Sequence, residues 1–258
     1  MSSINETNVV KKQYQNSNNL NTRISIHDKY STNKMGFGNW IFNNYNLFDE
    51  ADILELGCGT GSMWVGKSKE IENSNLVLSD FSSGMLDTAK KNLSNYKNIK
   101  YEIIDIQNIP YENESFDIVI ANMMLYHVPD INQALKEVKR VLKKDGIFYC
   151  ATYGENGIID YLSKLLSSCG VKDTTNKNFT LQNGFDILNQ HFNNVKRLDY
   201  KDSLAVTNID DLINYIYSLT SMTTLSEINK DRMKSILEEK MENGILNVPK
   251  EYGMFICK

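Results

Sequence analysis

One stretch decides the fold that this sequence predicts, Asp52-Ile53-Leu54-Glu55-Leu56-Gly57-Cys58-Gly59-Thr60-Gly61. Its apolar half is typical of a strand buried on both faces, and its glycines allow a sharp turn that brings the backbone close to a ligand. A dinucleotide site with the spacing G-x-G-x-x-G would need a glycine at position 62, where this chain has Ser62. The third glycine is Gly61 instead, so the pattern E-x-G-x-G-x-G indicates a nucleotide site of another kind.

Carboxylates follow the next two apolar strands. The strand from Leu76 to Leu78 leads to Asp80, about twenty residues after the glycine turn, where nucleotide-binding folds place an acid for the ribose hydroxyl groups. A carboxylate only accepts hydrogen bonds, so it can take both hydroxyl groups at once. Ser82 and Ser83 can cap the following helix, which would leave Asp80 free for the ligand. The third strand, Tyr101 to Ile104, ends at a second acid, Asp105.

Strands and helices alternate onward to residue 152. A fourth strand, Phe116 to Ala121, delivers the segment from Asn122 to Asp130 to the carboxyl edge of the sheet, where open α/β sheets bind ligands. Asp130 caps a helix with apolar residues at helical spacing, and we expect that helix to end near Asp145-Gly146. A fifth strand, Ile147 to Thr152, follows directly. The alternation predicts a doubly wound parallel sheet.

The glycine turn, the two acids, the Asn122 segment and the fifth strand resemble, in this order, the class I S-adenosylmethionine (SAM)-dependent methyltransferases. The resemblance implies an α/β, Rossmann-like sheet of seven strands whose last strand is antiparallel, with SAM as cofactor. It implies that Glu55 holds the methionyl end, Asp80 the ribose and Asp105 the adenine amino group. The cofactor-binding residues expected from it are Glu55, Gly57, Cys58, Gly59, Gly61, Asp80, Phe81, Met85, Asp105, Ile106, Gln107 and Asn122.

The acceptor side of the site is less constrained by sequence. His127 is the one histidine that the sheet argument places at the active edge, and its imidazole, which titrates near 6.5 when unperturbed, is the candidate catalytic base. The alternative is a histidine that hydrogen-bonds the loop or packs beneath the cofactor. Arg23, Tyr30 and Tyr126 are the candidate substrate-binding residues. A helix from Leu20 to Tyr30 would place Arg23 and Tyr30 on one face, where they belong either to a lid or to a solvated surface.

The organisation expected is one domain with attachments. Residues 1–50 would form an N-terminal mobile segment and a helical lid, residues 51–152 the SAM-binding core, and residues 153–258 the substrate-roof helices and final strands. A second helical stretch, expected to contain Trp40, Ile41, Tyr45 and Phe48, leads into the first strand of the core. The helical insertion near the C-terminus includes helices over Asp210 to Leu219 and Ser226 to Asn243, beside strands at Val195 to Tyr200 and Tyr252 to Cys257.

Composition narrows the function classes. The chain has 258 residues, 41% hydrophobic and 23% charged, with a net charge of −4 and a pI near 5.5, which argues against a nucleic-acid partner. No apolar run approaches the roughly twenty residues that span a bilayer, so no membrane partner and a cytoplasmic location are expected. The four cysteines lack metal-ligand spacing, and no metal is expected.

These observations predict methyl transfer from SAM to a small-molecule acceptor by in-line displacement, without a metal. Two other classes stay open: a SAM-binding protein without transferase activity, and a nicotinamide-dependent oxidoreductase, which Ser62 disfavours. The sequence leaves open the acceptor, the acceptor atom and the oligomeric state.

Overall fold

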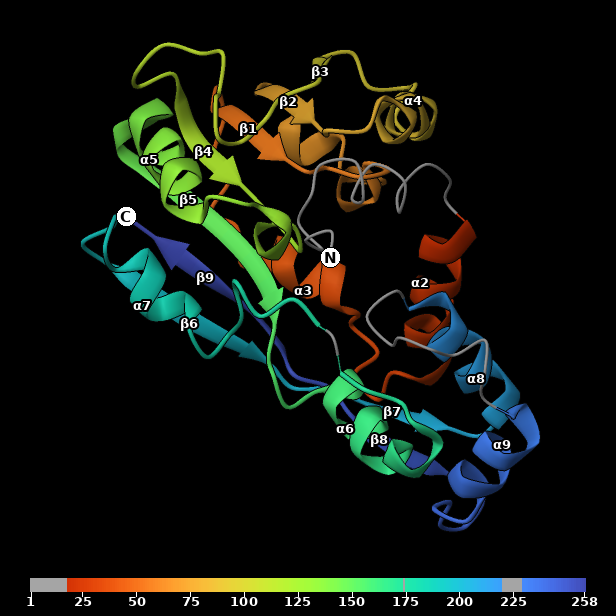
Figure 1. Cartoon of the computed structure of the whole chain (residues 1–258). Coiled ribbons are helices and arrows are strands. Elements are labelled where there is room, and N and C mark those ends of the chain that lie inside the picture. Colours follow the sequence, from red (N-terminus) through yellow and green to blue (C-terminus); the bar gives the residue numbers. More distant parts are fainter. Residues whose placement is uncertain (1–17, 174, 220–228) are drawn as a thin grey trace.

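The computed structural model describes residues 18–173, 175–219 and 229–258 (Figure 1). The mobile segment expected at the N-terminus lies, up to residue 17, outside the described residues. The same holds for residues 226–228 of the long charged helix expected near the C-terminus.

Seven strands form the main sheet in the order β3-β2-β1-β4-β5-β9-β6. The five strands β1 to β5 pair in parallel, whereas β9 lies antiparallel between β5 and β6, which confirms the expected Rossmann-like sheet with its inverted last strand. The strands are β1 (Asp52–Leu56), β2 (Asn75–Ser79), β3 (Ile99–Glu102), β4 (Phe116–Ile120), β5 (Leu142–Tyr153), β6 (Val195–Tyr200) and β9 (Tyr252–Cys257).

Helices connect the strands, and they lie on the faces of this sheet or beside it (Figure 1). They are α2 (Asn18–Tyr30), α3 (Phe37–Asn43), α4 (Ser83–Asn92), α5 (Ile131–Val141), α6 (Ile158–Leu165), α7 (Gly184–Leu188), α8 (Ile209–Ser218) and α9 (Lys230–Glu238). Short 3-10 turns occur at η1 (Ser62–Trp64), η2 (Lys69–Ile71), η3 (Leu125–His127) and η4 (Ser167–Cys169). None of the helices in the described ranges is long and apolar enough to cross a membrane.

Alternate residues of the central strands point to opposite faces of the sheet, and both faces are covered. Leu54 and Val119 pack under α5 and α7, while Ile53 and Ile118 pack under α3 and α4. All four side chains are fully buried. Each such aliphatic side chain contributes about 1.5–3 kcal/mol when removed from water, so this double burial explains the unbroken apolar runs in the sequence.

A second apolar cluster lies beside the sheet, where α2, α6, α8 and α9 surround a small two-stranded sheet of β7 (Ser203–Val206) and β8 (Leu246–Pro249) (Figure 1). The buried ion pair of Lys250 with Asp202 fixes this region, and Lys250 Nζ also donates to Ser31 Oγ at 2.9 Å. The chain leaving α2 is thereby tied to the connections that follow β6 and β8.

Three element boundaries differ from those expected. Helix α5 ends at Val141 and β5 begins at once, because Lys143 Nζ donates to Asp52 and Asp117 at 2.8 and 2.7 Å and holds this stretch extended beside β1 and β4. Strand β3 ends at Glu102, where its pairing with β2 ends. Helix α3 ends at Asn43, so Tyr45 lies beyond it.

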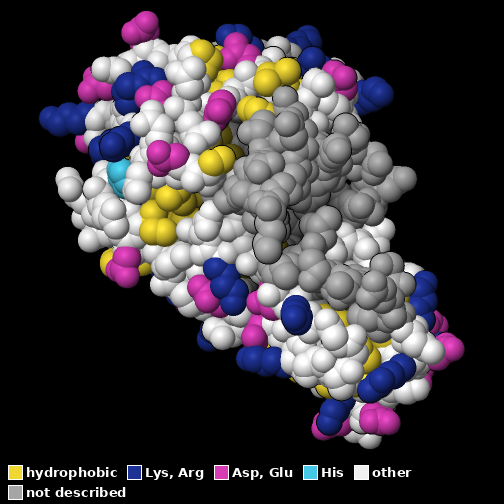
Figure 2. All heavy atoms as spheres, in the orientation of Figure 1, with side chains coloured by type: hydrophobic (Ala, Val, Ile, Leu, Met, Phe, Trp, Pro, Cys, Tyr) yellow, Lys and Arg dark blue, Asp and Glu magenta, His cyan; other side chains and the backbone are white. Residues whose placement is uncertain are grey.

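Charged side chains are mixed on the visible face of the molecule. Figure 2 shows Lys and Arg interspersed with Asp and Glu over the described residues. The mixture of signs agrees with the small net charge of −4, which results from 28 basic and 32 acidic residues.

Candidate active site

The glycine turn after β1 uses its three glycines differently. All three have positive φ, at +72° for Gly57, +55° for Gly59 and +68° for Gly61. A Cβ at Gly57 would lie 2.9 Å from Met124 Cγ, and one at Gly61 would lie 2.9 Å from Leu93 Cδ1. At Gly59 a Cβ would meet no described atom within 4 Å. Because Gly57 and Gly61 lack a Cβ, the turn can pack closely against Met124 and Leu93. Gly59 leaves space at the edge of the sheet that no described atom fills.

Asp80 follows β2 and is bonded to the glycine turn. Its Oδ2 accepts from Gly59 N at 2.9 Å and its Oδ1 accepts from Ser82 N at 2.8 Å. The expectation that the carboxylate is left free was wrong, although Ser82 does cap α4. Burial raises the pKa of Asp80, although the hydrogen bonds from backbone N–H groups lower it in part. Each oxygen keeps a further lone pair, so both can still accept from a ligand.

Glu55 is buried at the end of β1, with 3% of its surface exposed. Its Oε2 accepts from Trp64 Nε1 at 2.6 Å. Burial raises the pKa of Glu55 to about 7, although the Trp64 hydrogen bond lowers it. The sequence did not indicate a role for Trp64, a residue of η1 whose indole N–H donates this hydrogen bond.

Asn122 continues β4 into the segment that faces the glycine turn. Its Nδ2 donates to Tyr45 Oη at 2.6 Å. Within the described residues its Oδ1 is buried and has no hydrogen-bond partner. The next residue, Met123, adopts φ +53°, a conformation that L-residues rarely adopt and that is concentrated at functional sites.

The residues expected around adenine lie after β2 and β3. Met85 and Ile106 are buried, Phe81 is partly buried and Asp105 is exposed. The Asp105 carboxylate accepts from Gln107 N at 2.9 Å and from Gln107 Nε2 at 3.2 Å, which fixes the turn. Cys58, also expected at the cofactor, is buried inside the glycine turn.

His127 and Tyr126 lie in η3, at the end of the Asn122 segment. Burial, and after it the charge of Arg23, lowers the pKa of His127 to about 4. The imidazole is therefore neutral at physiological pH. The Tyr126 ring lies 4.5 Å from that of His127 and 4.6 Å from that of Tyr153, measured between centroids, so η3 and the end of β5 share an aromatic surface.

Arg23 and Tyr30 lie in the seam between α2 and α8. Arg23 Nε donates to Ser218 O at 3.0 Å, and Tyr30 Oη donates to Asp211 Oδ2 at 2.6 Å. Arg23 nevertheless lies near enough to His127 to influence its pKa. Tyr30 is held at the other end of the seam, and a substrate role for it stays a prediction.

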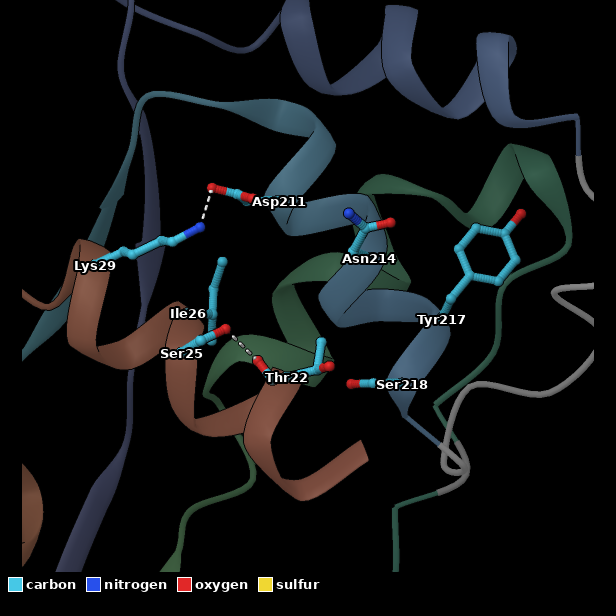
Figure 3. A pocket seen from close by; sticks show the side chains of 8 residues that line it. All are labelled: Thr22, Ser25, Ile26, Lys29, Asp211, Asn214, Tyr217 and Ser218. Atoms are coloured by element: carbon cyan, nitrogen blue, oxygen red, sulfur yellow. Dashed lines mark hydrogen bonds and ion pairs between the residues drawn. The ribbon is translucent and has the colours of Figure 1, made fainter. Parts of the chain in front are cut away.

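A groove of about 400 Å³ opens along this seam (Figure 3). Four of its residues come from α2 and four from α8, and the Lys29–Asp211 ion pair at 3.0 Å crosses it. It contains none of the residues of the glycine turn or of the Asn122 segment. The groove residues are Thr22, Ser25, Ile26, Lys29, Asp211, Asn214, Tyr217 and Ser218.

The chain is similar to known methyltransferases. Residues 54–150, which contain the glycine turn, Asp80, Asp105 and Asn122, match the methyltransferase domain family. The demethylmenaquinone methyltransferase of Lactobacillus johnsonii is 29% identical over 240 residues, 89% of this chain and 84% of that protein. The ubiquinone/menaquinone biosynthesis C-methyltransferase UbiE of Rickettsia prowazekii is 34% identical over 126 residues. This match covers 45% of this chain and only 51% of that protein.

The fold is shared with solved structures of low sequence identity. The YcgJ protein of Bacillus subtilis superposes with a TM-score of 0.58 over 85% of this chain and 96% of that chain, at 17% identity. This likeness extends beyond the matched core into the flanking helices and strands.

Proposed function

Because the chain carries a class I SAM-dependent methyltransferase domain, we propose that the protein transfers the methyl group of SAM to a small-molecule acceptor. One observation carries the proposal: the glycine turn, Asp80 and the Asn122 segment converge at the same edge of the sheet. Strands β1, β2 and β4 run parallel and end there, and open α/β sheets bind ligands at that edge.

SAM fits the residues at this edge. Gly59 leaves space for a close approach, and the buried Oδ1 of Asn122, without a partner among the described residues, is suited to accept from a ligand donor. In this assignment Glu55 and Asn122 hold the methionyl amino group, Asp80 the ribose hydroxyl groups and Asp105 the adenine amino group. When bound, SAM supplies a methyl group that its sulfonium centre has already activated.

The chain's own contribution is then alignment and exclusion of water. Holding an acceptor in line with the reacting bond can supply ~7–11 kcal/mol. In this proposal His127, whose imidazole is neutral because its pKa is about 4, accepts a hydrogen bond or proton from an acceptor hydroxyl. An imidazole with such a low pKa is a weak base. The positive charge of Arg23 would also favour loss of the acceptor's proton, because it stabilises an anionic acceptor.

We infer that the acceptor is a hydroxylated ring compound. The relative from Lactobacillus johnsonii is named for demethylmenaquinone, and its similarity covers most of both chains. The aromatic surface of Tyr126 and Tyr153 lies beside His127, where an acceptor ring could stack. Helix α2 and residues 153–190 would form the lid and roof of this pocket.

The test is incubation of the purified protein with methyl-labelled SAM and a fractionated metabolite extract, followed by mass spectrometry. We expect one labelled methyl group on a ring compound, together with stoichiometric S-adenosylhomocysteine. At limiting SAM, Gly59→Ala should strongly reduce the yield of product, and Gly170→Ala, a glycine with positive φ at the end of η4, should not. Tight SAM binding without any labelled product would favour a SAM-binding protein that lacks transferase activity.

A further inference from the structure

We propose that Tyr45 is a positioning residue, which orients the Asn122 amide so that its carbonyl oxygen receives the methionyl ammonium group of SAM. The proposal rests on the proposed function only for the pose of the cofactor. Tyr45 lies between α3 and β1, outside residues 54–150 that match the methyltransferase family.

The contact itself fixes the amide. Asn122 Nδ2 donates to Tyr45 Oη at 2.6 Å, which directs Oδ1 of the same group away from Tyr45. Among the described residues no donor meets this Oδ1, and it is buried. A buried acceptor without a partner is costly in a folded protein, so an orphaned oxygen of this kind is suited to a donor brought by a ligand.

Asn122 lies beside the glycine turn, the part of the sheet edge that the proposed function assigns to the methionyl end of the cofactor. Glu55 of β1 pairs with Ile120 of β4, and continuing that register by two residues places Asn122 level with Gly57. The amide therefore flanks the glycine turn.

The surroundings favour a cation. Burial raises the pKa of Tyr45 well above its usual value, and the charge of Glu55 raises it further. The Glu55 carboxylate and the Asn122 carbonyl are both acceptors, and together they suit an ammonium group with its three donors.

Tyr45 holds its place without the Asn122 bond. Its ring lies 4.9 Å from that of Tyr149 and 5.7 Å from that of Phe42, measured between centroids. The neighbouring Asn46 N donates to Tyr149 Oη at 2.9 Å. Tyr45→Phe should therefore keep the ring packing and remove only the hydroxyl group that fixes the amide.

The test compares two ligands by calorimetry: S-adenosylhomocysteine, and 5′-methylthioadenosine, which has the adenosine but neither the amino nor the carboxyl group. Tyr45→Phe should weaken S-adenosylhomocysteine about tenfold and change 5′-methylthioadenosine by less than about twofold. Tyr149→Phe is the matched control, because it removes the other tyrosine hydroxyl that binds this segment, and it should leave both affinities unchanged.

An equal loss for both ligands would overturn the proposal, because the effect would then lie in adenosine binding or general packing. Equal, selective losses in Tyr45→Phe and Tyr149→Phe would also overturn it, by assigning the effect to anchoring of the segment.

Asn122→Ala keeps the test decisive if Tyr45→Phe does not fold. It should show the same selective loss, and the double variant should show no further loss, because both changes remove one contact. Additive losses, or an unselective loss in Asn122→Ala, would overturn the proposal. A wild-type protein that binds no S-adenosylhomocysteine would overturn the proposed function as well.

Discussion

Gly59 and Gly61 give a matched pair of substitutions, because both have left-handed backbone and only their surroundings differ. An alanine costs about 1–2 kcal/mol in this conformation at either position. At Gly61 the added Cβ would also lie 2.9 Å from Leu93 Cδ1 and 3.2 Å from Ala89 Cβ, in a buried contact that adds about 1–3 kcal/mol of overpacking. Gly61→Ala should therefore lower the free energy of unfolding by about 2–5 kcal/mol, and Gly59→Ala by about 1–2 kcal/mol.

Ligand affinity should rank the two variants in the opposite order to stability, with the larger loss in Gly59→Ala. The Cβ of Gly59→Ala would enter the open space assigned to SAM, so we expect a loss of S-adenosylhomocysteine affinity of about tenfold or more. The assays are urea unfolding for stability and calorimetry on the folded variants. Gly170→Ala, with φ +81° and no described atom within 4 Å of its Cβ, controls for backbone strain. Gly59→Ala with full ligand affinity would refute the assignment of the open space to the cofactor.

Three further outcomes are expected. Asp80→Ala should weaken S-adenosylhomocysteine by ~1.5–3 kcal/mol in calorimetry, and unchanged affinity in a folded variant would remove Asp80 from the site. Once an acceptor is found, His127→Ala should lower kcat by ~10²-fold with nearly unchanged SAM affinity, whereas poor SAM binding with normal turnover at saturation would assign His127 to the cofactor. Burial lowers the pKa of His27 from 6.5 to about 3, so the free energy of unfolding should fall by up to about 1.4 kcal/mol per pH unit between pH 6.5 and about pH 3. His27→Phe should reduce this slope in acid unfolding, and an unchanged slope would contradict the burial argument.

The strands were predictable where both faces are buried. β6, a largely unburied edge strand, also has the predicted bounds. Among the buried strands, β9 has the predicted bounds, and β1, β2 and β4 differ by at most two residues at either end. These strands are apolar runs bounded by turn residues, and burial on both faces requires that pattern. β7 and β8 were missed because each has only four residues, with two buried side chains apiece, too few to establish a period.

The candidate site was predictable as positions along the sheet edge but not as contacts. Glycine spacing and acids after strands are local signals, and they located the turn, Asp80 and Asp105. The Tyr45–Asn122 bond joins residues 77 positions apart, and no local pattern predicts such a pair. Asp80 was expected to be free because Ser82 caps α4, yet the turn also brings Gly59 N to the carboxylate.

A crystal structure of the protein with S-adenosylhomocysteine tests the central claim most directly. The account predicts the ribose hydroxyl groups within hydrogen-bond distance of Asp80, the adenine amino group at Asp105, and the methionyl amino group at Asn122 Oδ1, with Gly59 against the ligand. Binding of the ligand in the groove between α2 and α8, or at the sheet edge without contact to Asp80 and Asn122, would contradict it.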